Sequence, residues 1–155
     1  MRLTCERTWR RRATTIVEMA FIAVLCFTLM FALFEYGRYV QARQVMENAA
    51  RAGARQAVIT ATSYTPPATA TAGVTSVINS ALANEPLQNV TITIYQSDTS
   101  GNNIGAWTNT PFGNNIIVQI DGDLPLMFPT HAFSPGGGSN SIHITTKVMM
   151  RGEAN

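Results

Sequence analysis

The feature that most constrains this chain is an uncharged apolar segment close to its N-terminus. No charged residue occurs between Met19 and Phe34, and two further apolar residues precede Glu18. Counted over residues 14–36, the segment is about 23 residues long. At roughly 1.5 Å per residue, an α-helix of that length spans a hydrocarbon core of about 30 Å. The sequence therefore predicts one transmembrane helix over residues 14–36.

Positive charge is distributed unevenly around this segment. Five of the eleven Lys and Arg residues precede it, and none occurs from Gln56 through Thr146. Because basic flanks stay in the cytoplasm, the asymmetry predicts a cytoplasmic N-terminus and a C-terminal part exported across the membrane. A part without basic residues also lacks the charge that binds nucleic acid, so no nucleic acid is expected as a partner. The two cysteines, Cys5 and Cys26, both precede the exported part, which must therefore be held together by packing alone.

A cleaved secretory signal peptide also begins with basic residues and continues with an apolar run. Its apolar region is about 7–15 residues long and is followed closely by a small-x-small cleavage site. Here the run is longer, and residues 31–39 contain no such site. A lipoprotein site at Cys26 is disfavoured, because Leu25 stands where a small residue is needed. The segment is therefore expected to remain as an anchor.

Glu18 lies inside the predicted membrane segment. An ionised carboxylate in an apolar helix costs on the order of 3 kcal/mol and is usually paired or functional. Alternatively, Glu18 lies near enough to the cytoplasmic interface to reach lipid headgroups or the arginines at positions 10–12. Position alone leaves both interpretations open.

The helix is expected to continue beyond the membrane, because no proline occurs before Pro66. Small and apolar residues recur at three- and four-residue spacing, which predicts an amphipathic helix over residues 37–60. The stripe comprises Tyr39, Ala42, Met46, Ala49, Ala50, Gly53, Ala54 and Ala57. Arg43, Glu47 and Arg51 lie four residues apart on a polar side and can pair. The stripe can pack on the chain's own head or, since small residues permit close approach, on helices of neighbouring subunits.

A linker and a short helix are expected next. Residues 61–72 are rich in Thr and Ala and contain two consecutive prolines, which end the long helix. An exported head is predicted over residues 73–155. It begins with a short helix over residues 72–84, whose apolar side is formed by Val74, Val77, Ile78, Ala81 and Leu82.

The rest of the head is predicted to form an antiparallel sheet. Apolar residues alternate with polar ones over residues 89–95 and 141–150, and the mostly apolar residues 115–120 are expected to form a further strand, which gives three strands. Residues 98–103 and the run Asp121-Gly122-Asp123 are expected to be turns, and residues 124–140 an irregular loop. A small sheet buries one face by packing on the long helix, which gives an α+β fold.

No catalytic constellation is evident in the sequence. His131 and His143, together with Asp121 and Asp123, could in principle bind a metal ion, but their spacing matches no recognised site. Solvated polar residues are the simpler interpretation. We therefore expect no cofactor, no metal and no enzymatic activity.

Three segments carry a family resemblance. Residues 10–21 read RRRATTIVEMAF, residues 35–57 contain EYGR followed by ENAARAGARQA, and residues 146–153 read TKVMMRGE. The first segment resembles the processing site of type IV pilin-like proteins. Together the three are most similar to the TadE/TadG-like pseudopilins of the tight-adherence (Flp-type) pilus system. The match is specific over residues 10–58, and the chain has Ala13 where the family usually has glycine.

The resemblance implies a maturation step and a function for Glu18. A prepilin peptidase would remove residues 1–13 by cutting between Ala13 and Thr14, which makes Glu18 the fifth residue of the mature chain. The new α-amino group of Thr14 could then pair with Glu18 of the same or an adjacent subunit. Removal of five arginines and one glutamate would change the net charge from +2 to −2.

The function expected from the resemblance is that of a non-enzymatic minor pilin or pseudopilin-like protein. It would act in pilus assembly, adhesion or secretion, with other pilin-like subunits, pilus assembly proteins and the prepilin peptidase as partners. The alternative is a bitopic envelope protein that is never processed and whose exported head binds a ligand or a protein partner.

Overall fold

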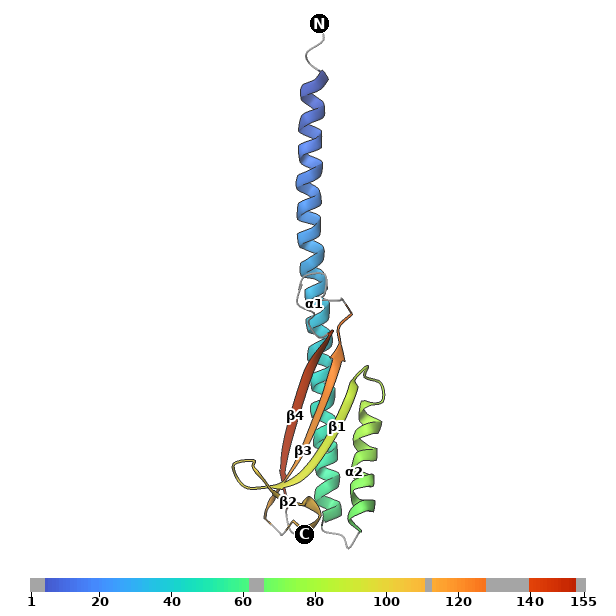
Figure 1. The fold of residues 1–155 in the computed structure, drawn as a ribbon, viewed down its shortest axis with the longest axis vertical. Helices are drawn as coiled ribbons and strands as arrows, with labels where there is room; N and C mark the ends of the chain where they lie inside the picture. The colour runs from blue at the N-terminus through green and yellow to red at the C-terminus, as the bar shows by residue number, and fades with distance from the viewer. Residues whose placement is uncertain (1–4, 62–65, 111–112, 128–139, 153–155) are drawn as a thin grey trace. The chain divides into compact units, whose positions relative to one another are not determined.

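Figure 1 shows a computed structural model of the chain, which describes residues 5–61, 66–110, 113–127 and 140–152. The elements are α1 (Cys5–Ala61), α2 (Pro67–Leu82), β1 (Gln88–Ser97), β2 (Asn103–Gly105), the 3-10 helix η1 (Trp107–Asn109), β3 (Asn115–Pro125) and β4 (Ser141–Arg151). A long helix, a short helix and a four-stranded antiparallel sheet confirm the predicted α+β fold class. The chain divides into two compact units, Met1–Arg38 and Tyr39–Asn155, described here in turn.

The first unit contains the N-terminal part of α1. The helix is uninterrupted from Cys5 to Ala61: the absence of proline predicted its continuity from residue 14, and its start at Cys5 was not predicted. Its apolar side chains face outward: Val17 is 70% exposed, Phe21 75% and Leu33 72%. Water disfavours such exposure, whereas lipid solvates it. Among the described residues, α1 is the one helix long and apolar enough to cross a membrane.

In the second unit, the rest of α1 packs into the core of the head. Ala42, Met46, Ala49, Ala50, Ala54 and Ala57 are fully buried. They form one hydrophobic cluster with residues of α2, β3 and β4. Of the two alternatives left open for this stripe, the structure shows packing on the chain's own head. Because most of its side chains are alanine, the neighbouring elements can approach the α1 backbone closely.

Helix α2 lies against α1 along a narrow line of residues. The buried positions are Ala70, Val74, Ile78 and Leu82, each four residues from the next. Val77 is 36% exposed and Ala81 is also exposed, so both were wrongly assigned to the apolar side. The helix begins at Pro67, five residues before the expected start, because a proline at the first helical position needs no hydrogen-bond partner for its nitrogen.

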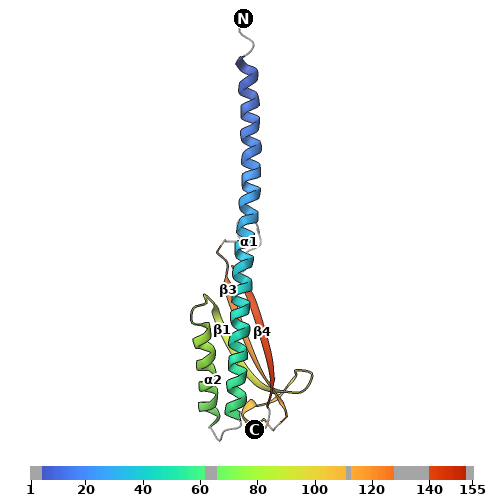
Figure 2. The ribbon, with the colours of Figure 1, turned by 180° about the vertical axis from the view of Figure 1, so that it is seen from behind.

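The sheet has the strand order β2-β1-β3-β4, and each neighbouring pair is antiparallel. In Figures 1 and 2, α1 lies along one face of the sheet. Strands β1, β3 and β4 confirm the three predicted strands, and β2 and η1 were not predicted. We call the face that packs on α1 the inner face and the opposite one the outer face.

The expected turn at Asp121-Gly122-Asp123 is wrong, because these residues lie within β3. They pair with Thr145, Ile144 and His143 of β4 in an unbroken register. The pairing of these residues with β4 outweighs their local preference for a turn. Leu124 and Pro125 also belong to β3, whereas His131 and most of the expected loop 124–140 lie outside the described residues.

The turn expected over residues 98–103 is held by Asp98. One carboxylate oxygen, Oδ1, accepts hydrogen bonds from the backbone N–H groups of Ser100 at 2.9 Å and Asn102 at 2.8 Å. The Asn102 side chain donates to the other oxygen at 3.0 Å. The Asp98 carboxylate therefore satisfies hydrogen-bond donors of the turn, as Asp does in many tight turns.

Candidate functional site

The residues predicted for processing and assembly all lie in α1. The bond between Ala13 and Thr14 is within the helix, and the side chains of Thr14 and Glu18 are exposed. Four residues separate Thr14 from Glu18, so both lie on one side of the helix, one turn apart. This spacing is compatible with the proposed pairing of Glu18 with a new Thr14 α-amino group. The cut and the pairing themselves stay predictions.

A second carboxylate near the other end of the membrane segment was not singled out from the sequence. Arg38 Nη1 donates to Glu35 Oε1 at 3.1 Å, and the two side chains are 26% and 16% exposed. The spacing of three residues on a helix was a signal available in the sequence. Pairing with arginine lowers the cost of holding Glu35 beside an apolar segment.

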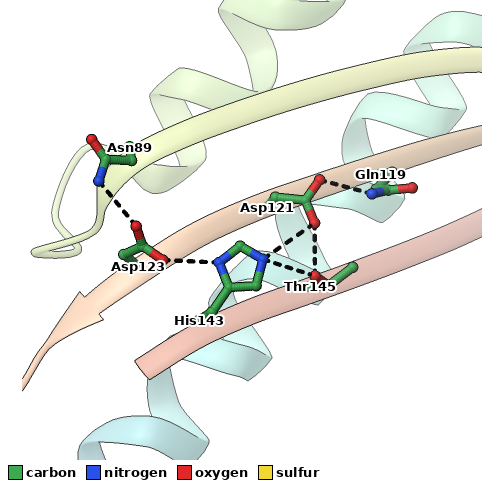
Figure 3. Close-up of polar contacts among 6 residues, drawn as sticks. All are labelled: Asn89, Gln119, Asp121, Asp123, His143 and Thr145. Atoms are coloured by element: carbon green, nitrogen blue, oxygen red, sulfur yellow. Dashed lines mark hydrogen bonds and ion pairs between the residues drawn. The ribbon is translucent and has the colours of Figure 1, made fainter. Parts of the chain in front are cut away.

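A polar network covers part of the outer face of the head (Figure 3). We call it the outer cluster; its members are Asn89, Gln119, Asp121, Asp123, His143 and Thr145. Residues 119, 121 and 123 share a face of β3 because side chains alternate along a strand. The register places Asp121 opposite Thr145 and Asp123 opposite His143. The sequence indicated three of these residues as possible ligands but did not show that they meet on one sheet face.

Hydrogen bonds hold each member of the outer cluster. His143 Nδ1 lies 2.8 Å from Asp123 Oδ1, and the Asn89 amide donates to Asp123 Oδ2 at 3.0 Å. Thr145 Oγ1 donates to Asp121 Oδ1 at 2.7 Å. Both hydrogen bonds to Asp123 favour its ionised form, so the Asn89 side chain first and His143 second lower the pKa of Asp123 below its ordinary 3.8.

The outer cluster is not arranged for nucleophilic attack. A hydroxyl activated by histidine donates its proton to the imidazole at about 2.6–3.2 Å. Thr145 Oγ1 instead donates to Asp121, and its distance to His143 Nε2 is 3.4 Å. Within the described residues, no group of three or more His, Cys, Asp or Glu side chains could hold a metal ion. The geometry is that of a solvated network that joins β3 to β4.

Asp123→Asn is expected to lower the stability of the head more at pH 7 than at pH 3. A carboxylate whose pKa is lowered by folding stabilises the fold above its unfolded pKa, and this contribution is lost as the pH falls through the folded pKa. Urea unfolding of the full chain in detergent, followed by fluorescence of the buried Trp107 in a Trp9→Phe background, measures both conditions. An equal loss of stability at the two pH values would contradict this origin of the effect.

These features define a class of protein: a small α+β head on a long N-terminal helix whose first part is apolar and exposed, as in pilin-like proteins. Residues 13–55 match the family model described as TadE-like protein. The match confirms the predicted family resemblance over the segment that contains the proposed processing site and most of α1. Neither a curated protein nor a solved structure matches the chain. The apolar helix and the family match together indicate a single-pass membrane protein associated with the Tad pilus system.

Proposed function

We propose that this chain is a minor pilin or pseudopilin-like subunit that acts in pilus assembly, adhesion or secretion. The observation that carries the proposal is the position of the TadE-like match, which begins at residue 13 and continues along α1 to residue 55. The match therefore includes both the apolar segment and the part of α1 that forms the core of the head. The proposed partners are other pilin-like subunits, pilus assembly proteins and a prepilin peptidase.

The proposed organisation follows the course of α1. Residues 1–13 are a cytoplasmic leader, residues 14–36 cross the inner membrane, and residues 37–60 continue into the head. Residues 61–72 connect this helix to residues 73–155, which complete the head. The structure starts α2 at Pro67, so the second half of the connecting segment is helical.

Replacing Ala13 by a bulky residue, as in Ala13→Leu, is expected to block maturation. The resemblance implies a peptidase that requires a small residue before the cut. Residues 1–13, with five arginines and a tryptophan, have a mass of about 1.7 kDa, a difference that gel electrophoresis and intact mass resolve. Ala13→Gly is the matched control and should be shortened like the wild type. If Ala13→Leu is shortened to the same mass as the wild type, the cut lies elsewhere.

The head is expected on the periplasmic side of the membrane. Five arginines precede the apolar segment, and basic flanks stay in the cytoplasm. Alkaline phosphatase fused after Ala57 should be active, and a fluorescent protein that folds only in the cytoplasm should be dark when fused at the same position. The reverse result would overturn export and the assembly function with it.

A second candidate function is that of an unprocessed envelope protein whose head binds a ligand or a protein partner. The outer cluster favours it, because it presents carboxylates, amides and a histidine on the exposed face of a sheet. Mass spectrometry of the membrane-extracted N-terminus separates the two functions. A mature chain that starts at Thr14 supports the pilin-like subunit, and an intact leader supports the envelope protein.

A further inference from the structure

Strand β4 is an edge strand of the sheet. In the order β2-β1-β3-β4, it pairs with β3, and no other described strand pairs with its second side. Its register with β3 is regular from Ser141 to Arg151, whereas β1 has irregular pairing with both of its neighbours. Proteins usually protect such an edge by making it short, by a bulge or proline, or by charged side chains, and of these β4 has only the charged side chains Lys147 and Arg151. Residues 142–151, without bulge or proline, present a backbone template for an added strand.

One side chain on the inner face of β4 lacks a partner. Thr146 is 8% exposed, and its Oγ1 forms no hydrogen bond within the described part of the chain. Buried hydroxyl groups are normally hydrogen-bonded, because leaving one unsatisfied costs free energy. Thr146 lies at the middle of β4, so a strand added at this edge would place a side chain directly beside it.

The outer face of β4 carries positive charge, which is otherwise absent from the head after α1. Lys147 and Arg151 are the only Lys or Arg residues after Arg55. Both are exposed, and they share the outer face because four residues separate them. Arg151 is held beside the sheet by a 3.0 Å hydrogen bond from its Nε to the Gly113 carbonyl oxygen. Side chains that lie opposite one another on neighbouring strands attract when their charges are opposite.

We propose that β4 is the docking edge for an extended acidic strand of a partner protein, which joins the sheet as a fifth strand. Its backbone hydrogen-bonds with β4, a hydroxyl side chain on its inner face pairs with Thr146, and carboxylates on its outer face lie opposite Lys147 and Arg151. A second copy of this chain fits less well, because its own free edge carries the same two cations. The proposal goes beyond the assembly role above and does not depend on cleavage of the leader.

The probe is a fluorescently labelled 11-residue peptide of alternating Thr and Val, with Glu at two positions four residues apart. A second peptide has Lys at those positions. Fluorescence anisotropy with the full chain in detergent should show that the Glu peptide binds at least about tenfold more tightly than the Lys peptide. Lys147→Glu should remove this preference. Arg55→Glu makes the same change of charge at an exposed position of α1 and should retain it.

A second pair of variants tests the buried hydroxyl. In the peptide, the Thr adjacent to one Glu is exchanged for Val, and in the protein Thr146 is exchanged for Val. The Thr peptide should bind about two- to tenfold better than the Val peptide to the wild type, and this difference should vanish with Thr146→Val. Trp107 fluorescence verifies that each variant is folded.

Several results would overturn the proposal. Equal binding of the Glu and Lys peptides, or no binding of either, would exclude an acidic strand. So would a Lys147→Glu variant that behaves like Arg55→Glu. Self-association through β4 would assign the edge to a second copy of the chain instead. It is detected by disulfide crosslinking of Thr145→Cys chains with Lys147→Cys chains in a cysteine-free background.

Discussion

Gly53→Val is expected to destabilise the head by about 2–3 kcal/mol, a large share of the roughly 5–15 kcal/mol that holds a small domain together. A Cβ atom at Gly53 would lie 2.6 Å from both Cγ1 and Cδ1 of Ile78, well inside the usual carbon–carbon distance of about 3.5–4.0 Å. Ile78 is fully buried, so it cannot move aside into solvent. Urea unfolding followed by Trp107 fluorescence measures the loss.

Gly73→Ala is the matched control for the change at Gly53. It also adds a side chain to a helical glycine of the head, but nothing lies within 4 Å of the new Cβ. It should therefore stabilise the head by about 0.5–1 kcal/mol, because alanine loses less backbone entropy on folding. Ile78→Ala should restore part of the stability of Gly53→Val, since the two positions are in direct contact. A Gly53→Val head as stable as the wild type would show that α1 and α2 do not pack this closely.

Glu18→Ala is expected to abolish association with pilus assembly partners while the chain is still inserted and cleaved. If the carboxylate pairs with a Thr14 α-amino group of a neighbouring subunit, its removal leaves that cation unpaired in a poorly solvated place. Losing one member of such a pair costs about 3–5 kcal/mol, which corresponds to at least about a hundredfold loss in association. This loss in association is measured by photo-crosslinking in cells from Ala20 or Ala23, at matched expression.

The alternative interpretation of Glu18 predicts the opposite result. A carboxylate that only reaches the interface is costly to insert, so Glu18→Ala would ease insertion and leave crosslinking unchanged. Glu35→Gln is the control, because it removes a carboxylate at the other end of the predicted membrane segment, where Arg38 is its partner. It should crosslink like the wild type. Equal crosslinking in Glu18→Ala and wild type would leave Glu18 without a role in assembly.

The helices were predictable because their signals are local. The absence of proline up to Pro66 and the recurrence of small residues were sufficient to predict α1 and the stripe that it buries. The extent of β3 was not predictable, because Asp121-Gly122-Asp123 favours a turn when only neighbouring residues are considered. What keeps it extended is pairing with β4, about twenty residues further along the chain.

The residues of the candidate site also differ in how far the sequence could predict them. Glu18 was evident as a charge inside an apolar run, and the outer cluster was not evident as a cluster. Asn89 comes from β1, and its contact with Asp123 depends on how β1 pairs with β3. Such registers depend on the packing of the whole sheet and leave no pattern of spacing in the sequence.

The burial of the alanine stripe limits how subunits of this kind can touch one another. The side of α1 that looks best suited to helix–helix contact is already occupied inside the head, and exposing it would require the head to unfold. Beyond residue 38, the exposed side of α1 is mostly polar, with Gln44, Asn48, Arg51 and Arg55 exposed, and Ile59 is its one exposed large apolar residue. Along this half of the helix, contact between subunits would therefore rely mainly on hydrogen bonds and on charge, and salt weakens the contribution of charge. Along residues 16–34, contact depends on the fit of apolar side chains in lipid, which salt leaves unchanged.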